Sequence, residues 1–508
     1  MKKIAVFLLI LTISIGLLGA LSVSADDFTP ILRYTVFSDI HIALENYVRC
    51  QKVENAIKYS YEYAKSDSRY DKLDAIVIVG DIGHGGEDRQ WGYAKDVILK
   101  NTDTDETSLM VLMGNHEFYA DEAGAKERFL DVFGDVNGKA GAKLVDKLDD
   151  VNAHYIINGI HFIAISPDVK EPWDHVYNEK KVAWVEVQLK AAEADTGKDK
   201  PIFMFQHIGN LETVLGTKVQ VPDMFKDIFD KYPQLINFSG HSHCPLNNEA
   251  SIWQGGYTAL GTGAFQNAIM PHFESLQAHT VDKDEEEIDQ FYIVEVDASG
   301  TTRITMHDAG DKKQVGETYL IDSYNTADFK YTPDRLAKFP FKFSDDAKLI
   351  VNDAIAHKIN FTFTPVKQDC LTATAYHVTI SDPDGNPVYN QCIGVAYYDE
   401  SEEDVTAEFG GILPALKEGV EYTLTVEGVN TAFIEKIDER AYHTENKLET
   451  KFHFGDLPQT APETEESTDN PVQPEKDSPV NIYVIIGISA AALLLIGAVI
   501  VIIVKKKK

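Results

Sequence analysis

Short apolar runs alternate with polar clusters along the first half of the chain, and each cluster begins where a run ends. Residues 31–37, 73–79 and 108–113 have the length and apolar content of buried strands. Residues 45–65 lie between the first two runs and show helical spacing of apolar positions among charged ones. This order predicts a strand, helix, strand unit with the polar clusters at the carboxyl ends of the strands, the edge where open α/β sheets bind ligands.

The same alternation continues beyond this unit. Residues 179–194 predict an amphipathic helix with Val182, Val185 and Leu189 on one side, and Trp184 and Val187 widen that apolar arc. Four further runs read as strands, at residues 201–205, 235–238, 291–296 and 302–306. The first two of these also end in polar clusters, so five strand ends are expected to converge on one place.

From about residue 333 to residue 455 the pattern becomes that of a small all-β unit. Four segments read as strands, at residues 358–365, 375–381, 388–395 and 422–429. Asp384-Gly385 is typical of a tight turn between two of them. The segment resembles a fibronectin type III or immunoglobulin-like sandwich, whose role is open between a spacer, a cell-wall or surface contact, and a lid beside the active site.

Both ends of the chain are expected to be membrane-directed. Residues 1–25 combine an N-terminal basic pair, an apolar run and small residues, as in a cleaved secretory signal; the alternative is an uncleaved anchor. Residues 482–504 are uncharged and precede four lysines at residues 505–508, which predicts a transmembrane helix with a cytoplasmic basic tail rather than a buried core helix. The body between them is therefore expected outside the cell, as a single-pass membrane protein.

Composition narrows the picture further. A chain of 508 residues with 44% hydrophobic content can bury a large core in more than one domain. Residues 456–481 are acidic and rich in proline, which predicts a disordered stalk. The formal net charge of −33 argues against polymeric nucleic acid as a partner. The four cysteines are too few for a disulfide scaffold, and Cys370 with Cys392 is a better candidate pair than Cys50 with Cys244.

The polar clusters consist of carboxylates, imidazoles and an amide, the side chains that hold borderline divalent metals. They are Asp39-Ile40-His41, Gly80-Asp81, Gly114-Asn115-His116-Glu117, His207 and Gly240-His241-Ser242-His243. In this order they resemble the signature of the calcineurin-like metallophosphoesterase superfamily, D-x-H, G-D, G-N-H-[ED], H, G-H-x-H, over about residues 28–308. The resemblance implies an α/β fold in four layers, two mixed β-sheets flanked by helices, in a catalytic domain at residues 28–320.

The resemblance also implies a ligand for each position. One metal ion would be bound by Asp39, His41, Asp81 and His243. The other would be bound by Asp81, Asn115, His207 and His241. Asp81 would bridge two divalent or trivalent ions of manganese, iron or zinc, since one carboxylate can span ions about 3.5 to 4 Å apart, and a hydroxide between them would attack phosphorus.

Three neighbouring residues have less direct roles by the same resemblance. His116 would protonate or stabilise the leaving oxygen, and Glu117 would support a ligand by a hydrogen bond. His84 stands where many relatives have an aspartate, and it would either bond to a ligand or touch substrate. The sequence around His116 is similar to secreted 5′-nucleotidases, but no Asn-Gly-Gly-Gly type adenine-binding segment follows it.

Other polar residues have plainer readings. His154, His161 and His175 are expected to be hydrogen-bonded core histidines. Cys244 follows a proposed ligand, where packing is favoured over a thiolate ligand. Residues 261–263 predict a tight turn rather than a phosphate cradle, and the acidic run at residues 282–287 predicts a solvated loop.

Two hypotheses follow. The first is an outward-facing, membrane-anchored phosphoesterase, a phosphatase or phosphodiesterase that acts on small phosphomonoesters or phosphodiesters. The second is a surface adhesion or binding protein whose hydrolase-like domain is inactive. The complete set of ligand types in the expected order favours the first.

Overall fold

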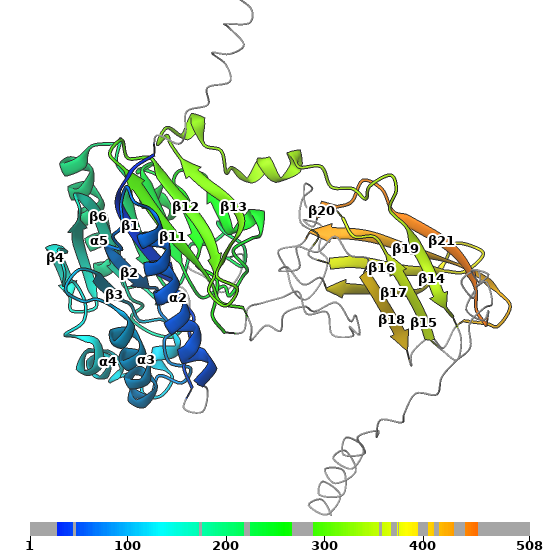
Figure 1. Cartoon of the computed structure of the whole chain (residues 1–508), viewed down its shortest axis with the longest axis horizontal. Helices are drawn as coiled ribbons and strands as arrows, with labels where there is room; N and C mark the ends of the chain where they lie inside the picture. The colour runs from blue at the N-terminus through cyan, green and yellow to red at the C-terminus, as the bar shows by residue number, and fades with distance from the viewer. Residues whose placement is uncertain are drawn as a thin grey trace, which may run out of the picture. The chain divides into compact units, whose positions relative to one another are not determined.

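The structure is a computed structural model, shown from blue at the N-terminus to red at the C-terminus in Figure 1. It describes residues 28–43, 47–171, 175–217, 224–266, 288–354, 358–366, 373, 375–394, 405–410, 416–430 and 442–455. Outside these residues lie the segments predicted as signal, stalk, transmembrane helix and basic tail, together with Cys370 and the acidic run at residues 282–287. Within them, no helix is long and apolar enough to cross a membrane.

The first sheet has six strands in the order β13-β12-β11-β1-β2-β3. Its members are β1 (Pro30–Phe37), β2 (Ala75–Ile78), β3 (Ser108–Val111), β11 (Gln290–Asp297), β12 (Thr302–Asp308) and β13 (Lys313–Ile321). The strands β1, β2 and β3 run parallel, whereas β11, β12 and β13 add in antiparallel fashion. The sheet is therefore mixed, and its parallel half carries the first three polar clusters at one edge.

The second sheet has seven strands in the order β4-β5-β6-β7-β8-β10-β9. Its members are β4 (Lys143–Asp149), β5 (Asn152–Ile157), β6 (Ile160–Ile165), β7 (Ile202–Gln206), β8 (Leu235–Ser239), β9 (Ile252–Gln254) and β10 (Thr258–Gly261). Strands β6, β7, β8 and β10 are parallel neighbours. This sheet is also mixed, and β7 and β8 supply the remaining polar clusters.

The two sheets face each other across an apolar core. Tyr34 of β1 meets Phe162 of β6 and Phe203 of β7 edge to face, with ring centroids 5.1 and 5.0 Å apart. All three side chains are fully buried. Aromatic rings of this size dominate the burial energy of a core, so the interlocked rings fix how one sheet lies on the other.

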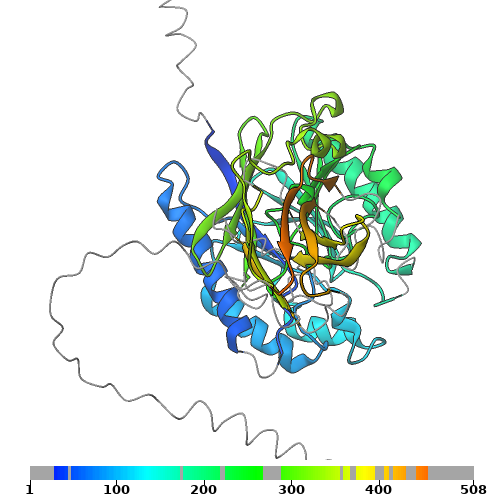
Figure 2. The ribbon, with the colours of Figure 1, turned by 90° about the vertical axis from the view of Figure 1, so that its right-hand side faces the viewer.

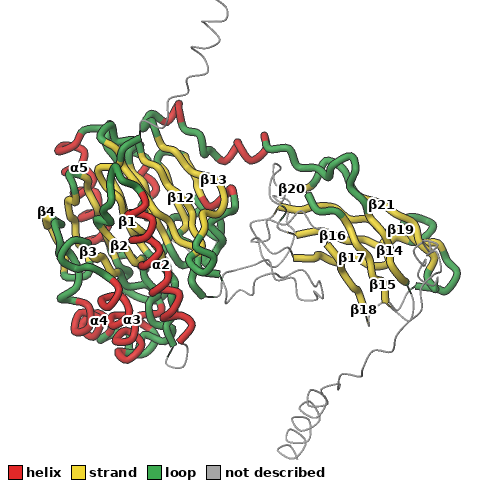
Figure 3. The backbone as a smooth tube through the Cα atoms, in the orientation of Figure 1, coloured by secondary structure: helices red, strands yellow, loops and turns green. Residues whose placement is uncertain are grey.

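Helices cover the outer face of each sheet. Those of the first sheet are α2 (Tyr47–Ser66), α3 (Asp88–Asn101) and α4 (Ala125–Phe133), and those of the second are α5 (Glu179–Thr196) and α6 (Lys226–Phe229). Short 3-10 turns are η1 (His116–Phe118), η3 (Glu249–Ser251), η5 (Thr326–Asp328) and η6 (Pro333–Lys338). In Figure 2 the blue helices and the green helices stand on opposite sides of the strands, and Figure 3 shows the same layers by type of element. Two mixed sheets flanked by helices are thus confirmed.

The five converging strands come from both of the predicted sheets, three from the first and two from the second. Other details differ from expectation. In α5, Val185 and Leu189 are buried, but Val187 is 60% exposed and does not widen the apolar face. Strands β4, β5 and β6 were not predicted. For β4 the reason is its exposed, charged pattern KLVDKLD, which gives little signal of burial, whereas β5 and β6 are largely buried.

The C-terminal part forms two further sheets around their own apolar core. One holds β14 (Leu349–Asp353), β15 (Lys358–Phe363) and β18 (Val405–Gly410); the other holds β16 (Ala375–Ser381), β17 (Pro387–Gly394), β19 (Glu421–Asn430), β20 (Tyr442–His443) and β21 (Leu448–His453). Phe361, Tyr376 and Leu424 from both sheets are buried together. The predicted β-sandwich is therefore present, with the turn between β16 and β17 at Gly385, whose φ of 82° suits glycine.

Candidate metal centre

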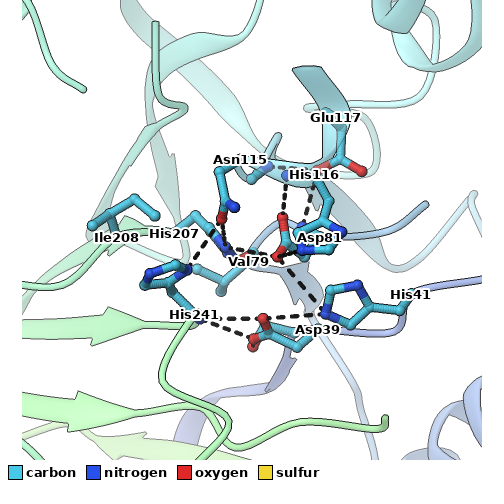
Figure 4. Close-up of polar contacts among 12 residues, drawn as sticks. Asp39, His41, Val79, Asp81, Asn115, His116, Glu117, His207, Ile208 and His241 are labelled. Carbon is cyan, nitrogen blue, oxygen red and sulfur yellow. Dashed lines mark hydrogen bonds and ion pairs between the residues drawn. The ribbon is translucent and has the colours of Figure 1, made fainter. Parts of the chain in front are cut away.

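Five strand ends bring the polar clusters to one centre. Strands β1, β2 and β3 of the first sheet end just before Asp39, Asp81 and Asn115. Strands β7 and β8 of the second sheet end just before His207 and His241. Figure 4 shows these five side chains pointing toward one another. The structure therefore brings together residues that lie up to two hundred positions apart in the sequence.

The backbone leaves these strands through sharp turns. Five of the proposed ligands have left-handed φ angles: Asp39 at 53°, His41 at 48°, Asp81 at 52°, His241 at 67° and His243 at 53°. Each such residue is disfavoured by roughly 1–2 kcal/mol in an L-amino acid. Conformations of this kind persist only where the surroundings hold them, and they are enriched at functional sites.

The first group of donors lies around Asp39. The Nε2 atom of His243 is 3.2 Å from Asp39 Oδ1 and 3.1 Å from His41 Nε2. His41 Nε2 also lies 3.8 Å from Asp39 Oδ1 and 3.7 Å from Asp81 Oδ2. One ligand atom from each of these four residues lies within 4.8 Å of the others, so together they can hold one metal ion.

The second group shares Asp81 with the first. His207 Nε2 is 3.2 Å from Asp81 Oδ2, and Asn115 Oδ1 is 3.1 Å from both His207 Nε2 and His241 Nδ1. His207 Nδ1 donates to the carbonyl oxygen of Val79 at 2.7 Å. Because that bond occupies Nδ1, the Nε2 atom is the one that faces the centre and can bind a metal.

The buried carboxylates and imidazoles of the centre shift one another's pKa values. Burial opposes the charge of Asp39 and Asp81, yet nearby histidines lower the pKa of both, most strongly that of Asp81. Burial would lower the pKa of His207, but Asp81 and Asp39 raise it to about 9. Burial lowers the pKa of His241 to about 4 and that of His41 well below its usual value. The buried carboxylates of Asp39 and Asp81 therefore need positive charge beside them.

Two buried carboxylates and the donor types around them fit divalent cations. The Nε2 atoms of His41 and His243 face each other at 3.1 Å. This arrangement suits two imidazoles that bind the same metal ion. Carboxylate, imidazole and amide oxygen donors together suit manganese, iron or zinc. Cys244 is outside the donor groups: it is buried, its thiol donates to Ser242 O at 3.3 Å, and burial raises its pKa to about 12.

His116 is held at the edge of the centre by its backbone and its ring. Its main-chain N–H donates to Asp81 Oδ1 at 2.9 Å, and its Nδ1 donates to the carbonyl oxygen of His84 at 2.7 Å. Its Nε2 lies 3.9 Å from Asp81 Oδ2. The ring thus presents Nε2 toward the place where the two donor groups meet.

Glu117 closes the loop after β2. Its carboxylate accepts main-chain N–H bonds from Asp81, Ile82, Gly83 and Gly114 at 3.0, 2.9, 3.0 and 2.6 Å. Burial and the charge of Asp81 raise the pKa of Glu117, while the amides of Gly83 and Gly114 oppose that rise. The structure therefore shows Glu117 supporting the backbone of Asp81 and not touching the ligand side chains.

Several supporting contacts were not predicted. The hydroxyl of Ser38 donates to Asp39 Oδ2 and also bonds to the hydroxyl of Thr262. The indole of Trp91 donates to Glu117 Oε1 at 3.3 Å, and Tyr119 stacks on His116. Serine before the D-x-H motif and tyrosine after G-N-H-E-F were visible in the sequence, but nothing in a single sequence marks them as partners of the centre.

Other singled-out residues lie elsewhere. His154 and His161 are buried and bonded to each other, Nε2 to Nδ1 at 2.7 Å, as expected of core histidines. The core prediction is wrong for His175, which is exposed in the loop before α5. Thr262 is fully buried and its hydroxyl donates to Ser239 O at 3.1 Å. The tight turn predicted at residues 261–263 is absent, because Gly261 ends β10 and irregular backbone follows it. Cys50, Cys244 and Cys392 are free thiols, so Cys50 and Cys244 form no disulfide.

Comparisons with known proteins were made for sequence and for structure. A family model described as calcineurin-like phosphoesterase matches residues 32–245. Among solved structures, the chain is similar to a purple acid phosphatase from yellow lupin seeds, at 14% sequence identity and a TM-score of 0.39, over 57% of this chain. The matched part spans 53% of that lupin chain, about half its length. No curated protein sequence matches.

Proposed function

Residues 32–245 belong to the calcineurin-like phosphoesterase family, and from this premise we propose that the protein hydrolyses small phosphate esters with two metal ions held by seven side chains. The ligands of this proposal are Asp39, His41, Asp81, Asn115, His207, His241 and His243. The observation that carries it is the position of Asp81, which belongs to both donor groups. Its Oδ2 atom lies 3.2 Å from His207 Nε2 and 3.7 Å from His41 Nε2.

A bridging carboxylate is what a pair of close cations requires. The cations would acidify a water molecule for attack on phosphorus and attract the phosphoryl oxygens. His116 is oriented by its bond to the carbonyl of His84, so that its Nε2 can donate a proton to the leaving oxygen. The buried Asp39 and Asp81 offer their oxygens from fixed backbone positions, which limits rearrangement on binding.

The substrate is proposed to be small and anionic. The chain carries a formal net charge of −33, so a long polyanion such as nucleic acid would be repelled by most of its surface. A small ester feels chiefly the centre, where bound cations set the local field. Monoester and diester substrates both fit this argument.

The direct test is metal-dependent turnover. Protein stripped with a chelator and reloaded with manganese, iron or zinc is expected to hydrolyse nitrophenyl phosphate or its diester analogue, and the comparison of the two esters identifies the preferred class. Asp81→Asn should abolish activity and lower the bound metal below two ions per chain. The matched control is Asp71→Asn, which changes an exposed carboxylate outside the centre. Inactivity with every metal would favour the alternative, a surface binding protein with an inactive hydrolase-like domain.

We also propose that the enzyme works outside the cell on a membrane anchor. The support is the uncharged stretch at residues 482–504, followed by four lysines, and the signal-like segment at residues 1–25. The β-sandwich precedes the proposed stalk in sequence, and we propose that it contacts wall or surface polymers. Intact cells treated with protease should lose phosphatase activity, and activity that resists protease until lysis would contradict this placement.

A further inference from the structure

His84 sits beside the centre on a backbone that its neighbours hold in place. Its N–H donates to Ile42 O at 3.1 Å, and its carbonyl oxygen accepts from His116 Nδ1 at 2.7 Å. Gly86 follows with a φ of 65°, where a Cβ atom would lie 2.6 Å from the carbonyl oxygens of His116 and Glu117. Because the loop packs this closely on the turn after β3, the position of His84 is fixed before any ligand binds.

The side chain of His84 is exposed and lies near the rings of His41 and His116. Within the described part of the chain, its ring nitrogens make no hydrogen bond. Its ring centroid lies 5.6 Å from that of His116 and 5.8 Å from that of His41. A ring nitrogen of each of the three histidines lies within 4.8 Å of the other two. A fixed backbone that displays an unpartnered donor next to a reactive centre has the properties of a ligand-binding position.

The flank around His84 favours an anion. Arg49 donates to the carbonyl oxygen of His41, next to Ile42, whose own carbonyl oxygen accepts from His84 N–H, so the guanidinium lies beside the loop of His84. The nearest following acids are already engaged. Glu87 caps α3, and Asp88 pairs with Arg128 at 2.7 Å. The chain as a whole carries a net charge of −33 and should repel anions. This flank differs, because it has imidazole and guanidinium groups and its acidic residues Glu87 and Asp88 already have partners.

We propose that His84 binds a second anionic group of the substrate, carried on the leaving side next to His116. The preferred substrates are then phosphate esters or anhydrides whose leaving group itself bears a phosphoryl or carboxylate group. The geometry supports the leaving side because the carbonyl of His84 orients His116, the residue placed nearest the leaving oxygen. This inference rests on the proposed function for its substrate, but its binding step does not require turnover.

The test compares two inorganic probes by calorimetry on the metal-loaded protein. Orthophosphate occupies the centre alone, whereas pyrophosphate adds a second phosphoryl group. His84→Ala is expected to lower the ratio of pyrophosphate to orthophosphate affinity at least tenfold, and His84→Gln, which keeps a donor, is expected to lower it less. Arg89→Ala removes an exposed cation on α3 and is the control that should keep the wild-type ratio.

Three results would overturn the proposal: an unchanged ratio in His84→Ala, an equal loss for Arg89→Ala, or a lower metal content in His84→Ala, which would make His84 a metal ligand. Where turnover is measurable, the ratio of kcat/KM for pyrophosphate to that for nitrophenyl phosphate should fall in the same way. If the loaded wild-type protein binds both probes and hydrolyses neither ester nor anhydride, the proposed function fails. The affinity ratio still decides the role of His84 in that case.

Discussion

The phenol ring of Tyr119 stacks on the imidazole ring of His116, with ring centroids 4.2 Å apart and planes 28° apart. His41 meets the same imidazole at a centroid distance of 4.5 Å and an angle of 77°. The hydroxyl of Tyr119 also accepts a long hydrogen bond of 3.4 Å from Asn115 Nδ2. One half-exposed aromatic side chain therefore contacts both a proposed ligand and the proposed proton donor.

Removing the ring of Tyr119 should slow catalysis more than removing its hydroxyl. Tyr119→Ala is expected to lower kcat for nitrophenyl phosphate about tenfold, because an unstacked His116 would spend less time aimed at the leaving oxygen. Tyr119→Phe should lower kcat by less than about threefold, since a 3.4 Å bond is weak. Tyr93→Ala, on the exposed face of α3, is the matched control. Equal effects of Tyr119→Ala and Tyr119→Phe would show that stacking does not position His116.

Glu117→Gln should weaken metal binding although Glu117 is not a proposed ligand. The change replaces one acceptor oxygen with an NH₂ group that would face main-chain N–H donors from the loop of Asp81. The buried mismatch is expected to cost about 1–3 kcal/mol of folding free energy and about 10-fold to 100-fold in metal affinity. Metal titration and thermal unfolding measure the two effects. Glu127→Gln, an exposed change in α4, should alter neither.

The sequence was sufficient to predict which residues would meet, for a physical reason. Apolar runs of strand length end directly before the polar clusters. Parallel strands place their carboxyl ends along one edge of their own sheet, and the two sheets bring these edges to one centre. Asp39, Asp81 and His207 follow such runs and lie together in the structure. The helix predicted at residues 45–65 is found as α2. It was predictable from its own pattern, because Val53 and Ile57 stand at helical spacing and both are fully buried.

What could not be predicted depends on contacts between segments that carry no local pattern. Thr262 reaches Ser38 across 224 positions, and the carbonyl of Val79 fixes the ring of His207 across 128. The residue types of a single sequence do not show which distant main-chain or side-chain groups will become hydrogen-bond partners. His175 was misjudged for a related reason, because an isolated histidine gives no period from which its exposure can be inferred.

Ser38→Ala should weaken one metal position more than the other. The hydroxyl of Ser38 holds Asp39 Oδ2, which leaves Oδ1 to face His243 at 3.2 Å. Without it, Asp39 can rotate, so the site of Asp39 and His243 should lose about tenfold in affinity, a typical effect for a bond that orients a ligand. Stepwise metal titration should show one weakened and one unchanged site. Ser66→Ala, on the exposed end of α2, is the control, and equal weakening of both sites would contradict the prediction.

A second pair of carboxyl groups lies where β11 begins and β12 ends. Asp289 is largely buried, and its carboxyl shares a hydrogen bond with that of Asp308. Burial, together with the charge of Asp308, raises the pKa of Asp289 to about 7, while the N–H of Gly310 bonds to Oδ1 at 3.0 Å and opposes the rise. The folded protein thus keeps a proton here that an unfolded chain releases near pH 4.

Asp289→Asn should therefore make stability less sensitive to pH. A carboxyl whose folded pKa is raised contributes stability that is complete below about pH 4 and is lost as the pH rises to about 7. The variant cannot ionise, so its free energy of unfolding relative to wild type should rise over this range, by up to about 4 kcal/mol from the size of the shift. Chemical denaturation at pH 4 to 8, with metal content held equal, measures the difference. Asp71→Asn should give a flat difference, and a flat difference for Asp289→Asn would mean that the pair is not protonated in the folded protein.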